Sequence, residues 1–251
     1  MFAIPRVQRP ISRLLWNVTG KEIGMLPMNF GSNLRQSMSA STSLQTFSRW
    51  PDRGTSRLTA HLEFINTLCE EPRFLGTLAD QIRNSTYRKE LAITGQVVLR
   101  KLRERADSDY LTTALAAAKS DDLSLLRSAA AGMWGITCEP ASADDLKILD
   151  HLMLREDQYV RETVVRTLWT IGKHPSRTQD AISRILAISP GQDKKLAGTI
   201  CDAFLYDRIS PQNLSATQVD ELLSNLLSVP DLDEHGITMF LGWTSEHARM
   251  P

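Results

Sequence analysis

Four basic residues recur at similar places along the sequence and could either form ion pairs or bind an anionic partner. They lie 39, 34 and 33 residues apart: Arg88, Arg127, Arg161 and Lys194. Each is followed by apolar or small residues at positions +3, +7 and +10, the spacing of one helix face. These cations could join neighbouring helices through Asp121, Glu156 or Asp157. Alternatively, they could form a stripe that binds phosphate or carboxylate groups of a partner.

Large aromatic residues lie close to these cations in the sequence. Trp134 follows Arg127 by seven residues, and Tyr159 precedes Arg161 by two. Aromatic and arginine side chains are enriched together at binding surfaces. The candidate binding residues are therefore Arg88, Arg127, Arg161, Lys194, Trp134, Trp169 and Tyr159. Trp134 and Trp169 are also long enough to fill gaps between helices, as is Phe204.

The sequence contains no recognisable catalytic, cofactor or metal motif. It lacks a phosphate loop, a dinucleotide-binding glycine pattern, a GxSxG motif and an HExxH motif, so no catalytic residue, cofactor or metal site is predicted. The acidic pairs 121–122 and 144–145 fall in expected first turns of helices, where they complement the helix dipole. The pairs Glu234–His235 and Glu246–His247 could bind iron but are expected on a solvated helix face.

The elements that position these residues are predicted to be helices throughout residues 57–251. Apolar residues repeat at helical spacing, and no segment alternates with the period of a strand. Helices are expected at 108–118, 121–137, 142–154, 176–188, 216–228 and 232–249. Ser142 with Asp145, and Ser215 with Gln218, have capping-box spacing. Small residues at 129–132 should let the helix at 121–137 approach a neighbour closely.

The helices alternate in pairs, and the copies around Arg127 and Arg161 resemble HEAT-like, armadillo-type repeats. The residues that carry this resemblance are Leu126, Arg127, Ala130 and Trp134, then Asp157, Val160, Arg161, Val164, Leu168 and Ile171. The resemblance covers about residues 57–250 and implies an α-solenoid (a superhelix) of about four to five helix pairs with a concave binding surface. A compact helix bundle is the alternative architecture.

The first 56 residues differ in composition from the rest of the chain. They contain seven basic and two acidic residues, whereas the remainder holds 22 basic and 27 acidic ones, so the whole chain is neutral. This Ser-rich and Arg-rich head is expected to be a mobile extension before a domain at 57–251. It lacks a secretory signal, so a cytoplasmic protein is expected, although a mitochondrial transit peptide is open. No apolar run approaches the roughly 18 residues of a membrane span.

Two functions follow from the resemblances. The solenoid implies a non-catalytic scaffold that binds another macromolecule, a protein above all, through its concave face. The stretch from Tyr159 to Pro175 is also similar to a helix of the HEAT-like alkylpurine DNA glycosylases, which implies an enzyme with Asp150 or Asp157 as its acid. The acidic body disfavours a DNA groove, since duplex binding depends on neutralising phosphates. Self-association through the terminal repeats is open, because 239–243 is apolar.

Overall fold

The computed structural model describes residue 63 and residues 65–85, 94–134, 141–205, 208–230 and 235–247. The chain divides into two compact units, residues 1–78 and 79–251. The predicted extension at 1–56 and the candidate residue Arg88 lie outside the described residues, as do Glu234 and the side chains of Glu246 and His247.

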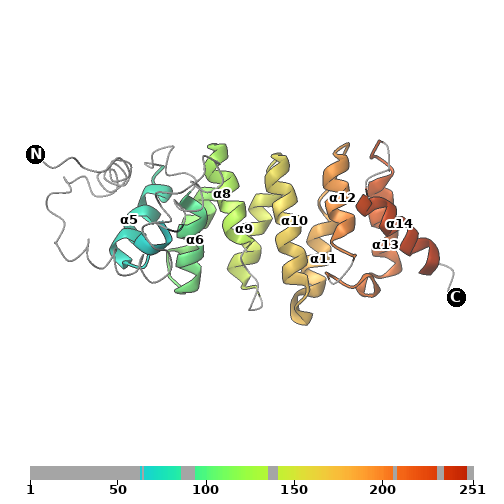
Figure 1. The fold of residues 1–251 in the computed structure, drawn as a ribbon, viewed down its shortest axis with the longest axis horizontal. Helices are drawn as coiled ribbons and strands as arrows, with labels where there is room; N and C mark the ends of the chain where they lie inside the picture. Colours follow the sequence, from blue (N-terminus) through green and yellow to red (C-terminus); the bar gives the residue numbers. More distant parts are fainter. Residues whose placement is uncertain are drawn as a thin grey trace, which may run out of the picture. The chain divides into compact units, whose positions relative to one another are not determined.

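The described residues form helices and contain no strand, which confirms the all-α prediction. The helices are drawn in Figure 1 and are, in chain order, α5 (Pro72–Arg83), α6 (Gly95–Glu104), α7 (Tyr110–Ala118), α8 (Leu123–Met133), α9 (Ala143–Met153), α10 (Gln158–Gly172), η3 (Pro175–Arg177), α11 (Thr178–Leu186), α12 (Lys194–Asp202), η4 (Pro211–Asn213), α13 (Ala216–Leu226) and α14 (His235–His247). Within these ranges, every helix is too short or too polar to cross a bilayer.

Short polar side chains fix where several helices begin. Ser142 and Asp145 form the predicted capping box of α9, and Ser215 and Gln218 form that of α13. Asp122, Asp157 and Asp193 accept hydrogen bonds from the first backbone N–H groups of α8, α10 and α12. These N–H groups have no partner inside their own helix, so each cap satisfies a donor that burial would otherwise leave costly.

In the unit formed by residues 79–251, a helix contacts the helix that follows it in the chain and also the one after that. In the even-numbered series, α6 contacts α8, α8 contacts α10, α10 contacts α12, and α12 contacts α14. The helices between them make similar contacts, α7 with α9 and α11 with α13. A surface built on α8, α10 and α12 therefore runs across three helices that lie side by side (Figure 1).

Glycines permit the closest of these approaches. A Cβ atom on Gly132 of α8 would lie 3.1 Å from the Gln96 Cα atom of α6, so the predicted close packing of the small residues in α8 is confirmed. A Cβ atom on Gly236 of α14 would lie 2.5 Å from the Gly198 carbonyl oxygen of α12. A larger residue at either place would separate two helices of the even-numbered series.

The apolar core contains one of the three aromatic residues that were expected to fill gaps between helices. Phe204 is fully buried and packs on Phe240 of α14, with ring centroids 6.3 Å apart. Trp134 is 43% exposed, so the prediction that it fills such a gap is wrong. It is the C-cap residue of α8 and lies beyond the last buried turn of that helix. Trp169 is half-buried.

Candidate binding face on helices α8, α10 and α12

A stripe of aromatic and charged residues follows one side of α10. Its members recur at helical spacing: Tyr159, Glu162, Arg166, Trp169 and Lys173. Tyr159 and Lys173 are exposed, Arg166 and Trp169 are half-buried, and Glu162 is buried. The apolar residues that anchor α10 in the core, such as Val160, Val164 and Leu168, occupy other positions of the helix.

Each of the three aromatic rings lies beneath an arginine from a neighbouring segment. The Arg127 Cζ atom lies 5.8 Å from the ring centroid of Tyr159, and that of Arg166 lies 5.6 Å from the ring centroid of Trp134. The Arg208 Cζ atom is only 4.0 Å from the ring centroid of Trp169. A guanidinium over an aromatic face is attracted by the negative face of the ring, so these contacts hold both side chains in one orientation at the surface.

We call this surface the aromatic–arginine face. It comprises the three rings, the arginines above them and two lysines beside them: Trp134, Tyr159, Trp169, Arg127, Arg166, Arg208, Lys173 and Lys195.

A buried acid lies beneath the face and binds two of its cations. Glu162 is only 7% exposed. Its Oε1 atom is 3.2 Å from the Lys195 Nζ atom of α12, and its Oε2 atom is 4.0 Å from Arg166 Nη2. Glu162 Oε1 has no partner of hydrogen-bond geometry among the described residues, so the attraction is an ion pair between charges at close range. Lys195 of α12 follows the predicted residue Lys194 and is the lysine that pairs with Glu162.

Arg127 joins α8 to the beginning of α10. Its Nε atom donates to both carboxylate oxygens of Asp157, at 3.1 and 3.2 Å, and its Nη2 atom donates to Oδ2 at 2.7 Å. The hydrogen bonds between the two side chains lower the pKa of Asp157 and raise the pKa of Arg127, although burial opposes both shifts. Asp157 also caps α10 by accepting from the Val160 backbone. Of the acids expected to pair with the recurring cations, Asp157 is thus the one that Arg127 contacts.

The other recurring cations of the described chain have different surroundings. Arg161 donates through Nη2 to the backbone carbonyl of Ser189, in the segment between α11 and α12. Lys194 is the first residue of α12 and is half-buried. Arg127 and Arg161 therefore each reach a segment of the next helix pair, the contact expected if these cations join neighbouring layers.

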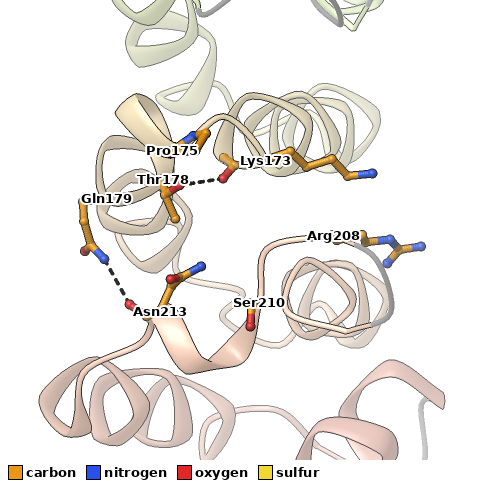
Figure 2. A pocket seen from close by; sticks show the side chains of 8 residues that line it. Lys173, Pro175, Thr178, Gln179, Arg208, Ser210 and Asn213 are labelled. Atoms are coloured by element: carbon orange, nitrogen blue, oxygen red, sulfur yellow. Dashed lines mark hydrogen bonds between the residues drawn. The ribbon is translucent and has the colours of Figure 1, made fainter.

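A pocket lies beside the C-terminal end of α10 (Figure 2). Its volume is about 400 Å³, and it is lined by Gly172, Lys173, Pro175, Thr178, Gln179, Arg208, Ser210 and Asn213. Thr178 donates to the Gly172 carbonyl at 2.9 Å, and Gln179 donates to the Asn213 carbonyl at 3.0 Å. These bonds join α11 to the end of α10 and to η4, so segments on both sides of the pocket are fixed.

A second polar cluster, formed by residues of α6, α7 and α9, was not found by sequence reasoning. The Asp145 side chain is completely buried. It accepts from Arg103 of α6 at 2.9 and 3.1 Å, from the Tyr110 hydroxyl of α7 at 2.7 Å and from the Ser142 backbone at 2.9 Å. Its first-turn position was predicted, but its burial was not, because Arg103 and Tyr110 lie 42 and 35 residues away.

Burial and hydrogen bonding act in opposite directions on Asp145. Burial raises the pKa of this carboxyl, but the bonds from Arg103, Tyr110 and Ser142 outweigh it, and the net shift is downward. Burial, reinforced by the charge of Asp145, raises the pKa of the Tyr110 hydroxyl well above its usual value. The cluster therefore holds an ionised carboxylate among α6, α7 and α9.

The two acids suggested by the glycosylase resemblance are both in ion pairs. Asp157 pairs with Arg127 as described, and Asp150 accepts from the Arg184 Nε atom at 2.7 Å and from its Nη2 atom at 3.1 Å. The hydrogen bonds that Arg184 donates to Asp150 raise the pKa of Arg184. Neither acid lines the pocket beside α10. Among the described residues, no group of three or more His, Cys, Asp or Glu side chains is arranged to hold a metal ion.

No protein-family model matches the sequence, and neither a curated protein nor a solved structure matches it significantly. The geometry of the aromatic–arginine face is therefore the basis on which a function is argued.

Proposed function

We propose that the chain is a non-catalytic interaction module that binds a protein partner through the aromatic–arginine face. The architecture that we propose for it is a HEAT-like α-solenoid, in which successive helix pairs stack. The contacts along the even-numbered series support this arrangement, because each helix of the series packs on the next one along. A cytoplasmic location stays an expectation from the sequence.

The observation that carries the proposal is the exposure of large aromatic rings beneath arginines. Trp134 is 43% exposed and Tyr159 is 44% exposed, although each ring would be stabilised by burial against apolar surface. Trp, Tyr and Arg are the residue types that contribute most to binding energy at protein interfaces. Here the arginines already orient the rings, so a partner would meet a surface that loses little side-chain entropy on binding.

The charges of the face favour a protein over a nucleic acid. Three of its arginines and one lysine form ion pairs with Asp157, Glu162 and Asp202. A nucleic-acid surface gains affinity by neutralising phosphates, whereas these cations are largely neutralised by the protein itself. The acidic excess outside residues 1–56 would also repel a long polyanion.

Affinity capture with the full-length chain tests this proposal. We would compare the wild-type chain with the double variant Trp134→Ala, Tyr159→Ala in nuclease-treated lysate. Both rings are more than two-fifths exposed, so the fold should survive their loss. A matched control is Leu154→Ala, which removes a side chain that is 78% exposed at the end of α9.

We expect the double variant to weaken capture of a stoichiometric protein by at least about tenfold, the effect of losing an interface hot spot. Leu154→Ala should leave capture unchanged. Equal capture by all three forms, with unchanged circular dichroism, would show that the partner binds elsewhere. Capture that disappears on nuclease treatment would replace the protein with a nucleic acid.

The glycosylase alternative gains no support from the site. Both of its candidate acids bind an arginine, and Asp157 is also the cap of α10. These contacts are those of carboxylates that join helices.

A further inference from the structure

We infer that the pocket beside α10 receives a carboxylate side chain, so that the partner of the aromatic–arginine face presents an acidic segment. This inference rests on the proposed function and adds the chemistry of the partner to it. The occupant to which we commit is an acidic peptide segment of another protein.

The pocket has cationic side chains on one side and polar groups on the other. Figure 2 shows Lys173 and Arg208 extending in the same direction, with Gln179 and Asn213 on the opposite side. Lys173 is exposed and forms no ion pair with any described residue. The charged end of Lys173 lies on the side away from Gln179 and Asn213, so an incoming anion would meet the ammonium group at the edge of the pocket, whereas the other cations of the face already have acidic partners (Figure 2).

Arg208 links this pocket to the rest of the face. Its guanidinium lies over Trp169, donates to the Asp202 carbonyl at 2.6 Å and is 3.3 Å from the Asp202 carboxylate. Lys173 is the C-cap residue of α10 and follows Trp169 by about one turn. A peptide that extends along α10 from the rings of the face therefore reaches the pocket at the end of the same helix.

Tight packing behind the pocket holds its walls in place. A Cβ atom on Gly172 would lie 2.5 Å from the Ile209 Cδ1 atom and 3.0 Å from the Ala181 Cβ atom. The end of α10 is thus pressed against α11 and against the segment that carries Arg208 and Ser210. A pocket whose walls are fixed before binding needs little reorganisation when it is filled.

The charge of the face favours one of the possible occupants of the pocket over the others. The face carries more cations than carboxylates, while the chain outside residues 1–56 has an acidic excess, so the face is a local exception to the surrounding charge. The basic residues 1–56 have the same sign as the face and are a poor match for it. An acidic segment of another protein is complementary, and such complementarity governs the choice of partner and the rate of encounter.

The test is selection of a random peptide library on phage against three immobilised full-length proteins. These are the wild-type chain, Lys173→Glu, and Lys147→Glu as a charge-matched control on α9, where Lys147 is also exposed. We expect the wild-type chain and Lys147→Glu to enrich the same peptides, with aspartate or glutamate at one fixed distance from an apolar residue. Lys173→Glu should lose that acidic position and keep the apolar one.

A synthetic copy of a selected peptide then gives the size of the effect. Replacing its acidic residue with the matching amide should weaken binding to the wild-type chain by about fivefold, the factor expected from one exposed ion pair. The same replacement should have no effect on Lys173→Glu. A peptide with lysine at that position should bind Lys173→Glu better than it binds the wild-type chain, a reversal that a purely structural role of Lys173 would not produce.

The possible results distinguish a failure of the carboxylate pocket from a failure of the proposed binding face. Enriched peptides that need Trp134 and Tyr159 but carry no acidic position would overturn the carboxylate pocket and leave the binding face intact. Enrichment of the same acidic peptides by Lys173→Glu would also overturn it. Failure of the wild-type chain to enrich any peptide would contradict the face as a peptide-binding surface, and the pocket inference would fail with it.

Discussion

Two carboxylate–arginine pairs join helices in this molecule, and they differ mainly in burial. Asp145 receives two hydrogen bonds from Arg103, and Asp157 receives three from Arg127. The Asp145 side chain is 0% exposed and that of Arg103 27%, whereas the Asp157 side chain is 13% exposed and that of Arg127 47%. The same chemistry thus occurs once inside the helix array and once at its surface.

The difference shows how burial changes what such a pair does. A buried carboxylate must have every acceptor satisfied, and Asp145 accordingly also binds Tyr110 and the Ser142 backbone. Removing one partner leaves the others without a counter-charge. The exposed pair can exchange its bonds for water at little cost. The buried cluster therefore stabilises the fold, while the exposed pair leaves its side chains available to a partner.

Replacing Asp145 should have the largest effect on stability. Asp145→Ala removes the acceptor of Arg103 and Tyr110 and half of the capping box of α9. We expect the free energy of unfolding to fall by about 3 kcal/mol, the range for breaking a buried ion pair. Urea unfolding followed by circular dichroism measures this loss.

The control is the neighbouring acid on the same turn. Asp144 is exposed, so Asp144→Ala should lose only about 0.5 kcal/mol of helix-dipole stabilisation. Equal losses for the two variants would mean that the Asp145 cluster is not the buried support that its geometry indicates.

Removing only the tyrosine hydroxyl should have a smaller effect. Tyr110→Phe keeps the ring but removes the 2.7 Å bond to Asp145. We expect a loss of about 1–2 kcal/mol, because a hydrogen bond to a charged acceptor is stronger than a neutral one. A double-mutant cycle with Asp145→Ala, which removes the acceptor, should show coupling of similar size. Additive losses would mean that the two side chains stabilise the fold independently.

Acid should weaken the wild-type protein more than the Asp145 variant. The pKa of Asp145 is lowered on folding, so its ionised form contributes stability above the unfolded value of about 3.9. That contribution is lost as the pH falls below about 4 toward the folded value. We expect Asp145→Asn to reduce the acid-induced loss by on the order of 1 kcal/mol. Identical acid-unfolding profiles for the two proteins would contradict this.

Breaking the exposed pair should have a much smaller effect on stability than breaking the buried one. Arg127→Ala should lower the free energy of unfolding by at most about 1 kcal/mol. It also frees the Tyr159 ring from its cation, so partner binding should weaken more than stability does. Thermal unfolding and affinity capture on the same samples separate the two effects. A stability loss as large as that of Asp145→Ala would remove the distinction between the two pairs.

Much of the helical framework could be predicted from local patterns. Apolar spacing placed the helices, and the capping boxes at Ser142 and Ser215 marked two of their beginnings. The Arg127–Asp157 pair was among the expected contacts because both residues belong to the recurring pattern. These features depend on residues within one helix, or on one spacing repeated along the chain.

The parts that escaped prediction depend on residues from different helices. Asp145 has the local sequence of an ordinary first-turn acid, and only the packing of α6 and α7 shows it to be buried. Arg166 and Arg208 lie outside the recurring register, so their positions over Trp134 and Trp169 were missed. The sequence did indicate that Glu162, Arg166 and Trp169 share one side of α10. Their role in a binding face became clear only from the contacts with α8, α12 and the segment that carries Arg208.

The contacts that join helices have a consequence for how the chain folds during synthesis. Many of them link residues 28 to 42 positions apart, as in the bonds from Arg161 to Ser189 and from Arg103 to Asp145. Each contact closes a short loop, and short loops close at low entropic cost. All members of the Asp145 cluster lie within residues 103–145, so the cluster can form before Arg208 and η4 are available. The pocket also needs Arg208 and η4, so a chain that ends before these residues would contain the Asp145 cluster and Lys173 but would lack Arg208, Ser210 and Asn213 from the lining of the pocket.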